Sequence, residues 1–230
     1  ALYPNLLFMD CDSEITSGNY IRNYLPYCDK TIVICGGRSY RTDPPEETEF
    51  LLRWLYGIKR EQWSDTTRNK NPYRSFMTNN FLIPREILLQ VQFDESLIQY
   101  GHEDTLFGIE LRRRGVKVLH IQNPLLHIGL EISWEFIRKT SEGIENLFML
   151  LRSGKINRND IQDIRVLKVY HSLKRLRLVG LYQWTYNFII NLVMRNLLGS
   201  NPSIFALDLY KLSLLVNLDR RGRTTVPSFH

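Results

Sequence analysis

Two carboxylates, Asp10 and Asp12, follow the short apolar run LLFM near the beginning of the sequence. The run predicts a buried strand that delivers its last side chains to the edge of a sheet. Side chains two positions apart on an extended strand point the same way, so both acids can face one site. Two negative charges so close together are costly unless a cation lies between them. Oxygen ligands suit Mg²⁺ or Mn²⁺, and a site with few protein ligands leaves room for substrate phosphates.

A second pair of acids and a histidine follow much later in the chain. Glu103 and Asp104 stand at the start of a predicted helix, whose dipole favours negative charge there. His127 lies in the apolar stretch LLHIGL, after a predicted strand VKVLHIQ. Each feature also has a purely structural interpretation. Asp12 can cap the next segment, the acid pair can be a helix N-terminal box, and His127 can be a hydrogen-bonded core residue.

The elements that must position these groups alternate between strands and helices. A buried strand at residues 31–35 ends at Gly36-Gly37, where the backbone can approach a ligand or turn sharply. The other predicted elements are an amphipathic helix at 46–60, a polar and mobile loop at 62–73, an extended segment at 75–83 and a short helix that Pro84 opens. This succession predicts an α/β protein.

Composition limits the classes of protein to consider. With 230 residues, of which 43% are hydrophobic, the chain can bury one good core or two small ones. Its three cysteines, Cys11, Cys28 and Cys35, lack metal-ligand spacing and lie beside or within apolar runs. They are therefore predicted to be buried reduced thiols of a cytosolic protein. We find no signal peptide and no internal repeat.

Charge is unevenly distributed, with a net charge of −3 in residues 1–150 and +9 in residues 151–230. The C-terminal third of the sequence predicts helices at 134–154 and, as one long or two shorter helices, at 157–199. Its uncharged stretch, 178–194, is too short and too polar for a membrane span. Basic and aromatic residues around it fit a helix that contacts the membrane surface peripherally. The alternative is that these helices pack on the catalytic core or on a second subunit of a homodimer.

Taken in order, these segments resemble the catalytic half of the family 2 inverting glycosyltransferases, which have the A-type nucleotide-sugar fold. The resemblance covers residues 1–130 and is carried by the Asp-x-Asp strand, SFMTNNFLIPRE, FDESLIQYGHEDTLFGIELRRRG and NPLLHIGLE. The same segments are similar to those of chondroitin polymerase and the β-1,4-galactosyltransferases. The resemblance implies a partial A-type fold in residues 1–132, followed by a helical C-terminal region in residues 133–230.

The resemblance also implies roles for individual residues. Asp12 and His127 match the ligands of a Mn²⁺ or Mg²⁺ ion, and Asp10 joins Asp12 in binding the donor. Asp104 matches the catalytic base. The residues that match acceptor-binding positions are Glu103, His102 and Asn79.

The implied activity is transfer of a sugar, with inversion, from a nucleotide-diphosphate sugar to a glycan or lipid-linked acceptor. A UDP-sugar is the expected donor, surface polysaccharide synthesis the expected pathway, and the cytoplasm or inner membrane face the expected location. The donor-binding strands of this fold precede the Asp-x-Asp strand, and only nine residues precede Asp10. We therefore expect either a truncated reading frame or an upstream chain that supplies the other half, and an isolated chain that is inactive.

Three further classes of function compete with this hypothesis. A non-catalytic module that binds sugar or dimerises would also fit a missing donor half. A metal-dependent phosphotransferase would use Asp10 and Asp12, but it would not explain the later acid pair and histidine. A nucleic-acid-binding protein would use the basic tail, but the aromatic residues there lie in an apolar helix, so we expect no nucleic-acid partner.

Overall fold

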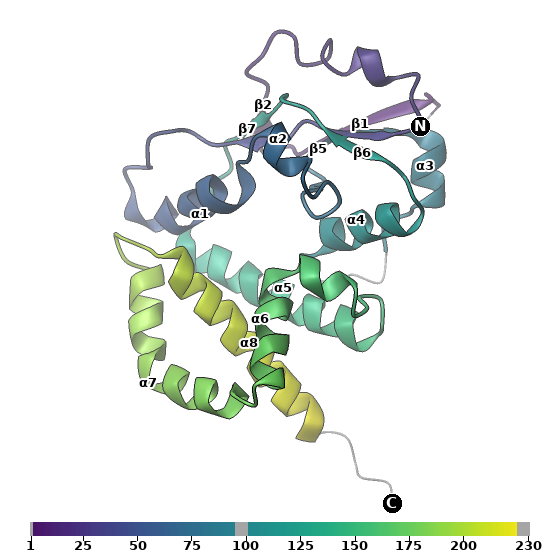
Figure 1. Cartoon of the computed structure of the whole chain (residues 1–230). Coiled ribbons are helices and arrows are strands. Elements are labelled where there is room, and N and C mark those ends of the chain that lie inside the picture. The colour runs from purple at the N-terminus through teal and green to yellow at the C-terminus, as the bar shows by residue number, and fades with distance from the viewer. Residues whose placement is uncertain (1, 95–100, 225–230) are drawn as a thin grey trace, which may run out of the picture. The chain divides into compact units, whose positions relative to one another are not determined.

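A computed structural model describes residues 2–94 and 101–224, with side chains up to residue 221. The protein is mixed α/β, with 51% helix and 11% strand, so helices form most of its framework and the sheets are small (Figure 1). This agrees with the predicted α/β class. Residues 95–100, which belong to the quoted segment that leads into the Glu103-Asp104 pair, lie outside the described residues.

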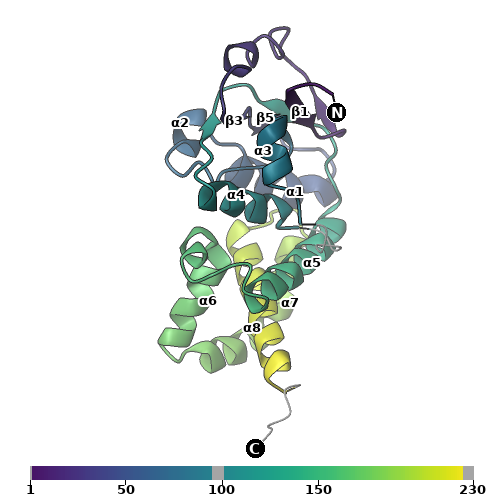
Figure 2. The same cartoon turned by 90° about the vertical axis from the view of Figure 1, so that its right-hand side faces the viewer.

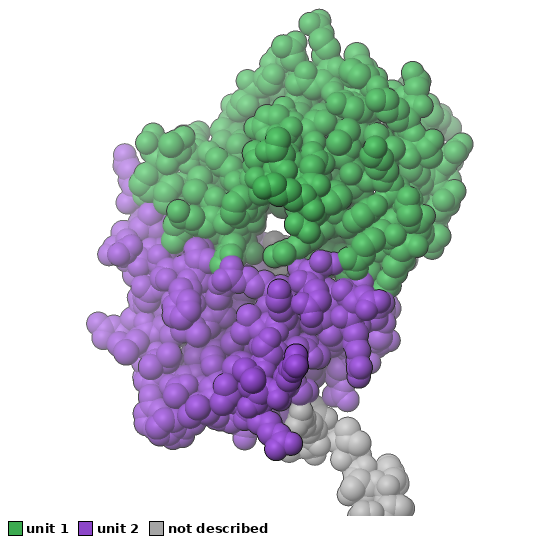
Figure 3. Space-filling model, in the orientation of Figure 1, with its two compact units in different colours: residues 1–45, 53–96, 103–130 green, residues 46–52, 97–102, 131–230 purple. Residues whose placement is uncertain are grey.

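The chain divides into two compact units, which Figure 3 colours separately. Unit 1 holds Ala1–Pro45, Arg53–Ser96 and Glu103–Leu130, and unit 2 holds Glu46–Leu52, Leu97–His102 and Glu131–His230. The described strands all belong to unit 1, whereas the long C-terminal helices belong to unit 2 (Figures 1 and 2). The predicted acids and His127 therefore all lie in unit 1.

The larger sheet of unit 1 has the strand order β1-β5-β3-β6. The β5 strand runs antiparallel to both of its neighbours, and β6 pairs parallel to β3. These segments are rich in Val, Ile, Leu and Phe, which suit a buried pleated surface. The strands are β1 (Asn5–Met9), β5 (Asn80–Pro84), β3 (Val33–Cys35) and β6 (Val118–His120).

Alternate side chains of this sheet enter two different clusters, as the period of a strand requires. Phe81 of β5 packs with Ile87 of α3 (Arg85–Gln90) and with Phe107 of α4 (Glu103–Arg113). Leu82 points the other way and packs with Tyr20 and Tyr24 of the N-terminal segment, which includes the short helix η1 (Leu25–Tyr27). The helix that begins at Glu103 is thereby anchored to the sheet.

A second, three-stranded sheet has the order β2-β7-β4. The short strand β2 (Ser13–Glu14) pairs antiparallel with β7 (Leu125–His127), which pairs parallel with β4 (Arg38–Ser39). Its register sets Ser13 opposite His127, although the two residues are far apart in the sequence. This small sheet brings the end of the Asp-x-Asp segment to the histidine.

The predicted helix at 46–60 is present as a continuous helical segment, which changes its hydrogen-bonding pattern twice. Its parts are η2 (Thr48–Phe50), α1 (Leu51–Tyr56) and the π-helix η3 (Gly57–Glu61). A Cβ atom at Gly57 would lie 2.3 Å from the ring of Tyr40, so only glycine allows this close approach. Single π turns are frequent at functional sites, and this one ends at Glu61, a charged residue whose side chain is only 17% exposed.

The prediction of a polar loop at 62–73 is partly correct, because the segment is mostly irregular but contains the short helix α2 (Asp65–Arg68) and a buried arginine. The Arg68 guanidinium donates to the carbonyl oxygens of Cys35, Gly36, Trp63 and Ile121 over 2.8–3.3 Å. The polar composition of this segment gave no sign that Arg68 would contact four backbone carbonyls. Through these hydrogen bonds the segment is held against the end of strand β3.

The ring of His120 completes the environment of Arg68. Burial, together with the Arg68 charge, lowers the pKa of His120 to about 4, so the ring is neutral near pH 7. Its Nδ1 atom lies 2.9 Å from Arg68 Nη1, and its Nε2 atom lies 2.9 Å from the Pro72 carbonyl oxygen. Nδ1 therefore accepts and Nε2 donates.

Unit 2 is built from four long helices, and α8 packs against the other three. Its residues 204–224 were not predicted as a helix, whereas the predicted helices at 134–154 and 157–199 agree with the structure. Within the described part of the chain, none of the helices has the length and hydrophobicity that crossing a bilayer requires. The elements are α5 (Ser133–Arg152), η4 (Asp160–Asp163), α6 (Arg165–Arg175), α7 (Val179–Leu197) and α8 (Ile204–Thr224).

The prediction for the cysteines is only partly correct. All three are free thiols, but Cys11 is exposed, Cys28 is half-buried and only Cys35 is fully buried. Cys11 lies between the two acids of the Asp-x-Asp segment and follows β1, where the chain leaves the sheet. Apolar neighbours in the sequence did not reveal this change of environment.

We expect Arg68→Met to destabilise the protein by on the order of 3 kcal/mol or more, because it removes the hydrogen bonds that a buried charged group donates to four carbonyl oxygens. Chemical denaturation monitored by circular dichroism measures this loss. The control is Arg41→Met at an exposed position, for which we expect a change within about 0.5 kcal/mol. Equal effects of the two substitutions would show that the buried guanidinium contributes no more to the free energy of unfolding than an exposed one does.

Candidate functional site

Asp12 and His127 meet at the junction between β1 and the small sheet. The backbone N–H of Ile128 donates to the Asp12 carbonyl oxygen over 2.9 Å, which continues the β2–β7 pairing by one residue. Asp12 Oδ1 then lies 3.5 Å from His127 Nδ1. Gly129 permits this packing, because a Cβ atom there would lie 2.7 Å from Asp12 Cβ. The predicted partners are therefore neighbours in space.

The contact between these two side chains is not an ordinary ion pair. Burial, together with the charges of Arg38 and Arg53, lowers the pKa of His127, so the ring is neutral near pH 7. A separation of 3.5 Å is also too long for a good hydrogen bond. Among the described residues, Asp12 Oδ1 and both ring nitrogens of His127 have no hydrogen-bond partner. Buried polar atoms in this state need an explanation.

A divalent cation would fit this pair of atoms. Two ligand atoms that lie about 2.1 Å from one ion and subtend about 90–110° are about 3.0–3.4 Å apart. Neutral imidazole and carboxylate are both metal ligands. In the described part of the chain there is no group of three or more His, Cys, Asp or Glu side chains around a common point. Water or phosphate oxygens would have to complete the coordination, as is common for Mg²⁺.

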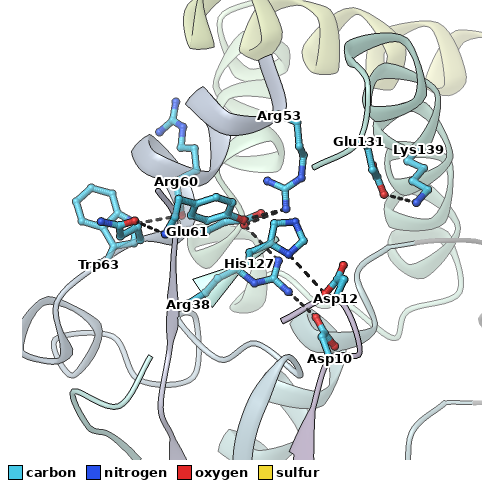
Figure 4. Close-up of polar contacts among 12 residues, drawn as sticks. Asp10, Asp12, Arg38, Arg53, Arg60, Glu61, Trp63, His127, Glu131 and Lys139 are labelled. Carbon is cyan, nitrogen blue, oxygen red and sulfur yellow. Dashed lines mark hydrogen bonds and ion pairs between the residues drawn. The ribbon is translucent and has the colours of Figure 1, made fainter. Parts of the chain in front are cut away.

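Asp10 turns toward Arg38 of β4 and forms an ion pair with it (Figure 4). Burial raises the pKa of Asp10, although the Arg38 guanidinium opposes this shift. Arg38 also lies 3.4 Å from the Glu61 carboxylate, and Arg53 lies 3.2 Å from the same carboxylate oxygen. The Asp-x-Asp segment is thus held by a charge cluster, which we define as Asp10, Arg38, Tyr40, Arg53 and Glu61.

Tyr40 connects this charge cluster to His127. Burial raises the pKa of Tyr40, so its hydroxyl stays protonated and donates to Glu61. The Tyr40 ring meets the His127 ring edge to face, with 5.3 Å between the ring centres. Burial alone would raise the pKa of Glu61, but Arg53 and Arg38 hold it below its ordinary value. Glu61 is therefore an anion that the two arginines stabilise.

Asn79 lies directly beside the first acid of the pair. Its carbonyl oxygen accepts the backbone N–H of Asp10 over 3.0 Å. The side chain is only 3% exposed, and both of its amide atoms lack a hydrogen-bond partner among the described residues. Leaving a buried polar group unpaired costs about 1–3 kcal/mol. Asn79 is thus a candidate for contact with a ligand, and the acceptor-binding role that the resemblance implies for it stays a prediction.

Asp104 occupies the first turn of α4, next to Glu103. Burial raises the pKa of Asp104 to about 6, although a 2.8 Å hydrogen bond from the Thr105 N–H favours the ionised form. The charges of Glu61 and Arg38 also act on Asp104, in opposite directions. Asp104 is therefore an acid that changes protonation state near neutral pH, which is what a general base requires.

His102 belongs to unit 2, so its predicted place beside the acceptor stays a prediction. Burial, together with the Lys211 charge, lowers the pKa of its ring to about 4. Its φ angle is 71°, an uncommon value for a residue other than glycine, and it follows Gly101 with a φ angle of 99°. Such backbone strain is concentrated at functional sites and switch segments.

Four residues of the site were not predicted from the sequence: Arg38, Tyr40, Arg53 and Glu61. A weak signal existed for Arg38, because it follows Gly36-Gly37 at the end of a predicted strand. No signal existed for Arg53 and Glu61, because charges in an amphipathic helix ordinarily face solvent. The π turn and the small sheet turn them inward.

Comparison of the chain with models of known protein families and with curated proteins found no match. The chemistry of the side chains is therefore the basis for a functional hypothesis. Unit 1 combines a carboxylate-imidazole pair without other partners, a buried charge cluster and an acid with a pKa of about 6. Together these groups can bind a divalent cation and accept a proton.

We expect Asp104→Asn to stabilise the protein near pH 7.5 by on the order of 1–3 kcal/mol, since about 1.4 kcal/mol accompanies each pKa unit. The folded state binds the Asp104 proton more tightly than the unfolded state, so wild-type stability decreases as the pH rises from about 4 through about 6. The variant should lose this decrease and match the wild type near pH 4. Denaturation at several pH values measures the difference.

The control for this measurement is Glu86→Gln, which removes an exposed acid from the first turn of α3. We expect it to cost a few tenths of a kcal/mol through the helix dipole. An Asp104→Asn variant that is less stable than the wild type at pH 7.5 would contradict the raised pKa of Asp104.

Proposed function

We propose that unit 1 is the catalytic half of a metal-dependent inverting glycosyltransferase with the A-type nucleotide-sugar fold. The observation that carries this proposal is the 3.5 Å contact between Asp12 and a neutral His127, whose facing atoms have no other partner in the described residues. A sugar transferase that releases a nucleoside diphosphate needs a cation at such a place. The raised pKa of Asp104 supplies the second requirement, a base.

Asp12 and His127 are proposed to hold Mn²⁺ or Mg²⁺. When bound, the cation would neutralise negative charge on the departing diphosphate of a UDP-sugar. Asp10 is proposed to bind the donor, and Arg38 positions it through their ion pair. Since the two charged arginines already neutralise Glu61 and Asp10, Asp12 is the acid that remains for the metal.

Asp104 is proposed to take the proton from the acceptor hydroxyl as that oxygen attacks the anomeric carbon of the sugar. Above pH 6 its carboxylate is mostly ionised and can accept this proton. Successive side chains on a helix point about 100° apart, so Glu103 cannot reach the same hydroxyl. Glu103 and Asn79 are proposed to contact the acceptor, a glycan or a lipid-linked sugar in surface polysaccharide synthesis. The same role for His102, a residue of unit 2, stays a prediction.

A second candidate function is a non-catalytic module that binds sugar or dimerises. It is favoured by the absence of a group of three or more metal-ligand side chains within the described residues. The pairing of Asp10 with Arg38 also shows that a metal is not required to compensate that acid. The two functions differ in one measurable property, because only the enzyme needs a cation at Asp12.

We expect the protein to bind Mn²⁺, and Asp12→Asn or His127→Ala to weaken the binding by ~10-fold or more, because each removes one ligand atom. Electron paramagnetic resonance of free Mn²⁺ measures the affinity. Bound Mn²⁺ should also slow the reaction of the exposed Cys11 with a thiol reagent. The matched control, Asp29→Asn at an exposed position, should change neither property. Unchanged affinity in both ligand variants would refute the metal site.

In a polypeptide that includes the donor-binding half, we expect Asp104→Asn to lower kcat by ~10²-fold or more with donor binding intact. The amide keeps the shape of the side chain but cannot accept the proton. Wild-type turnover should fall as the pH drops through about 6, where Asp104 becomes protonated. A steady-state assay of nucleoside diphosphate release measures both effects.

Glu103→Gln is the matched variant at the adjacent position, and it should mainly raise the KM for the acceptor. Near-normal kcat in Asp104→Asn would show that another group is the base. Mn²⁺ binding at Asp12 without any sugar transfer would favour the non-catalytic module.

A further inference from the structure

A stripe of large apolar side chains lies on the exposed face of α7. Leu181, Trp184, Phe188 and Leu192 are 57%, 61%, 69% and 62% exposed, respectively. Spacings of three and four residues keep all four on one side of a helix. The Trp184 and Phe188 rings meet edge to face, with 4.9 Å between their centres. We call these four side chains the α7 stripe.

The α7 stripe is not the side of the helix that packs into unit 2. Tyr186, Val193 and Leu197 point the other way and are at most 6% exposed. On that packed side, the Tyr182 hydroxyl donates to the Leu209 carbonyl oxygen of α8 over 2.7 Å. The helix therefore already has its core contacts. An additional exposed row of four large apolar groups is typical of an interaction surface.

Positive charge surrounds the α7 stripe. From residue 164 to residue 207 the sequence contains no Asp or Glu, but it contains six Lys or Arg residues. Two of these cations have carboxylate partners, because Arg165 pairs with Asp208 and Lys174 pairs with Asp219. Arg175 and Arg177 before α7, and Arg195 in its last turn, are exposed. For these three arginines, the described residues supply no carboxylate partner.

The charge pattern decides between the possible occupants of this surface. In a symmetric dimer, each copy would present the same cations around its stripe, so like charges would face one another across the interface. An anionic lipid surface instead offers phosphate groups to the arginines and an apolar layer to the stripe. Tryptophan and phenylalanine beside arginine are typical of helices that lie in the interface plane.

We propose that α7 binds anionic membrane surfaces, lying in the plane of the bilayer with the α7 stripe at the boundary between headgroups and acyl chains. Arg175, Arg177 and Arg195 contact the lipid phosphates. This surface is on unit 2 and involves none of the residues of the candidate site, so it does not depend on the proposed glycosyltransferase activity.

Vesicle flotation tests the proposal. The protein should float with vesicles that contain one quarter phosphatidylglycerol in phosphatidylcholine, but hardly with pure phosphatidylcholine. Raising the salt concentration from 0.1 M to 0.5 M should weaken the binding, because it screens the arginine charges. Trp184→Ser/Phe188→Ser should reduce the bound fraction at least tenfold. The matched control is Trp134→Ser on α5, where the side chain is 59% exposed, and it should bind like the wild type.

Two further variants separate the apolar and the charged contributions. Arg175→Gln/Arg177→Gln should weaken binding to anionic vesicles about tenfold or more and leave the weak binding to neutral vesicles unchanged. Trp184→Phe should keep the affinity but remove most of the fluorescence quenching by brominated lipids, because Trp184 is the tryptophan that enters the bilayer. This conservative variant also keeps the test valid if the serine pair fails to fold.

Several outcomes would overturn the proposal. The proposal is overturned if the wild-type protein does not float with anionic vesicles. It is also overturned if Trp134→Ser and Trp184→Ser/Phe188→Ser reduce the bound fraction equally, or if brominated lipids still quench the fluorescence of Trp184→Phe fully. A concentration-dependent dimer that the Trp184→Ser/Phe188→Ser variant dissociates, without vesicle binding by the wild type, would assign the α7 stripe to a second copy of the chain.

Discussion

The candidate site depends on one buried carboxylate, Glu61, between the guanidinium groups of Arg38 and Arg53. Removing a carboxylate from water costs several kcal/mol unless cations and hydrogen bonds compensate it, and here two arginines and the Tyr40 hydroxyl do so. Because Arg38 also pairs with Asp10, the same interaction joins the π turn, the small sheet and the end of β1. Loss of either arginine would leave one cation to compensate two carboxylates, those of Asp10 and Glu61.

Besides burial, the same two cations influence the protonation of the groups around them. After burial, Arg38 and Arg53 are the causes that lower the pKa of His127, and Arg38 moderates the raised pKa of both Asp10 and Asp104. A neutral imidazole can bind a cation, and an acid with a pKa of about 6 can accept a proton near neutral pH. The chemistry attributed to the site is therefore a consequence of its buried charges as much as of the acids themselves.

The two units differ in where they place charged and apolar side chains. Unit 1 buries Arg53 and Arg68, leaves the Glu61 side chain only 17% exposed, and compensates each of these charges with specific partners. Unit 2 keeps its arginines exposed around α7 but exposes a row of apolar side chains beside them. A network of buried, fully paired charges holds side chains in fixed positions, as a binding or catalytic site requires. Exposed apolar side chains beside arginines suit binding to a membrane surface.

By itself, the sequence determined the features that rest on local patterns: the strand before Asp10, the helix that begins at Glu103, most of the C-terminal helices and the acids and histidine as candidates. Periodicity and helix-end preferences act over a few residues, so these features can be read directly. Only the tertiary structure decided that Glu61 lies between Arg38 and Arg53, that Arg68 is buried, and that the α7 stripe is exposed. Each of these depends on which distant segments pack together, and burial sets the protonation of a side chain more strongly than its neighbours in the sequence do.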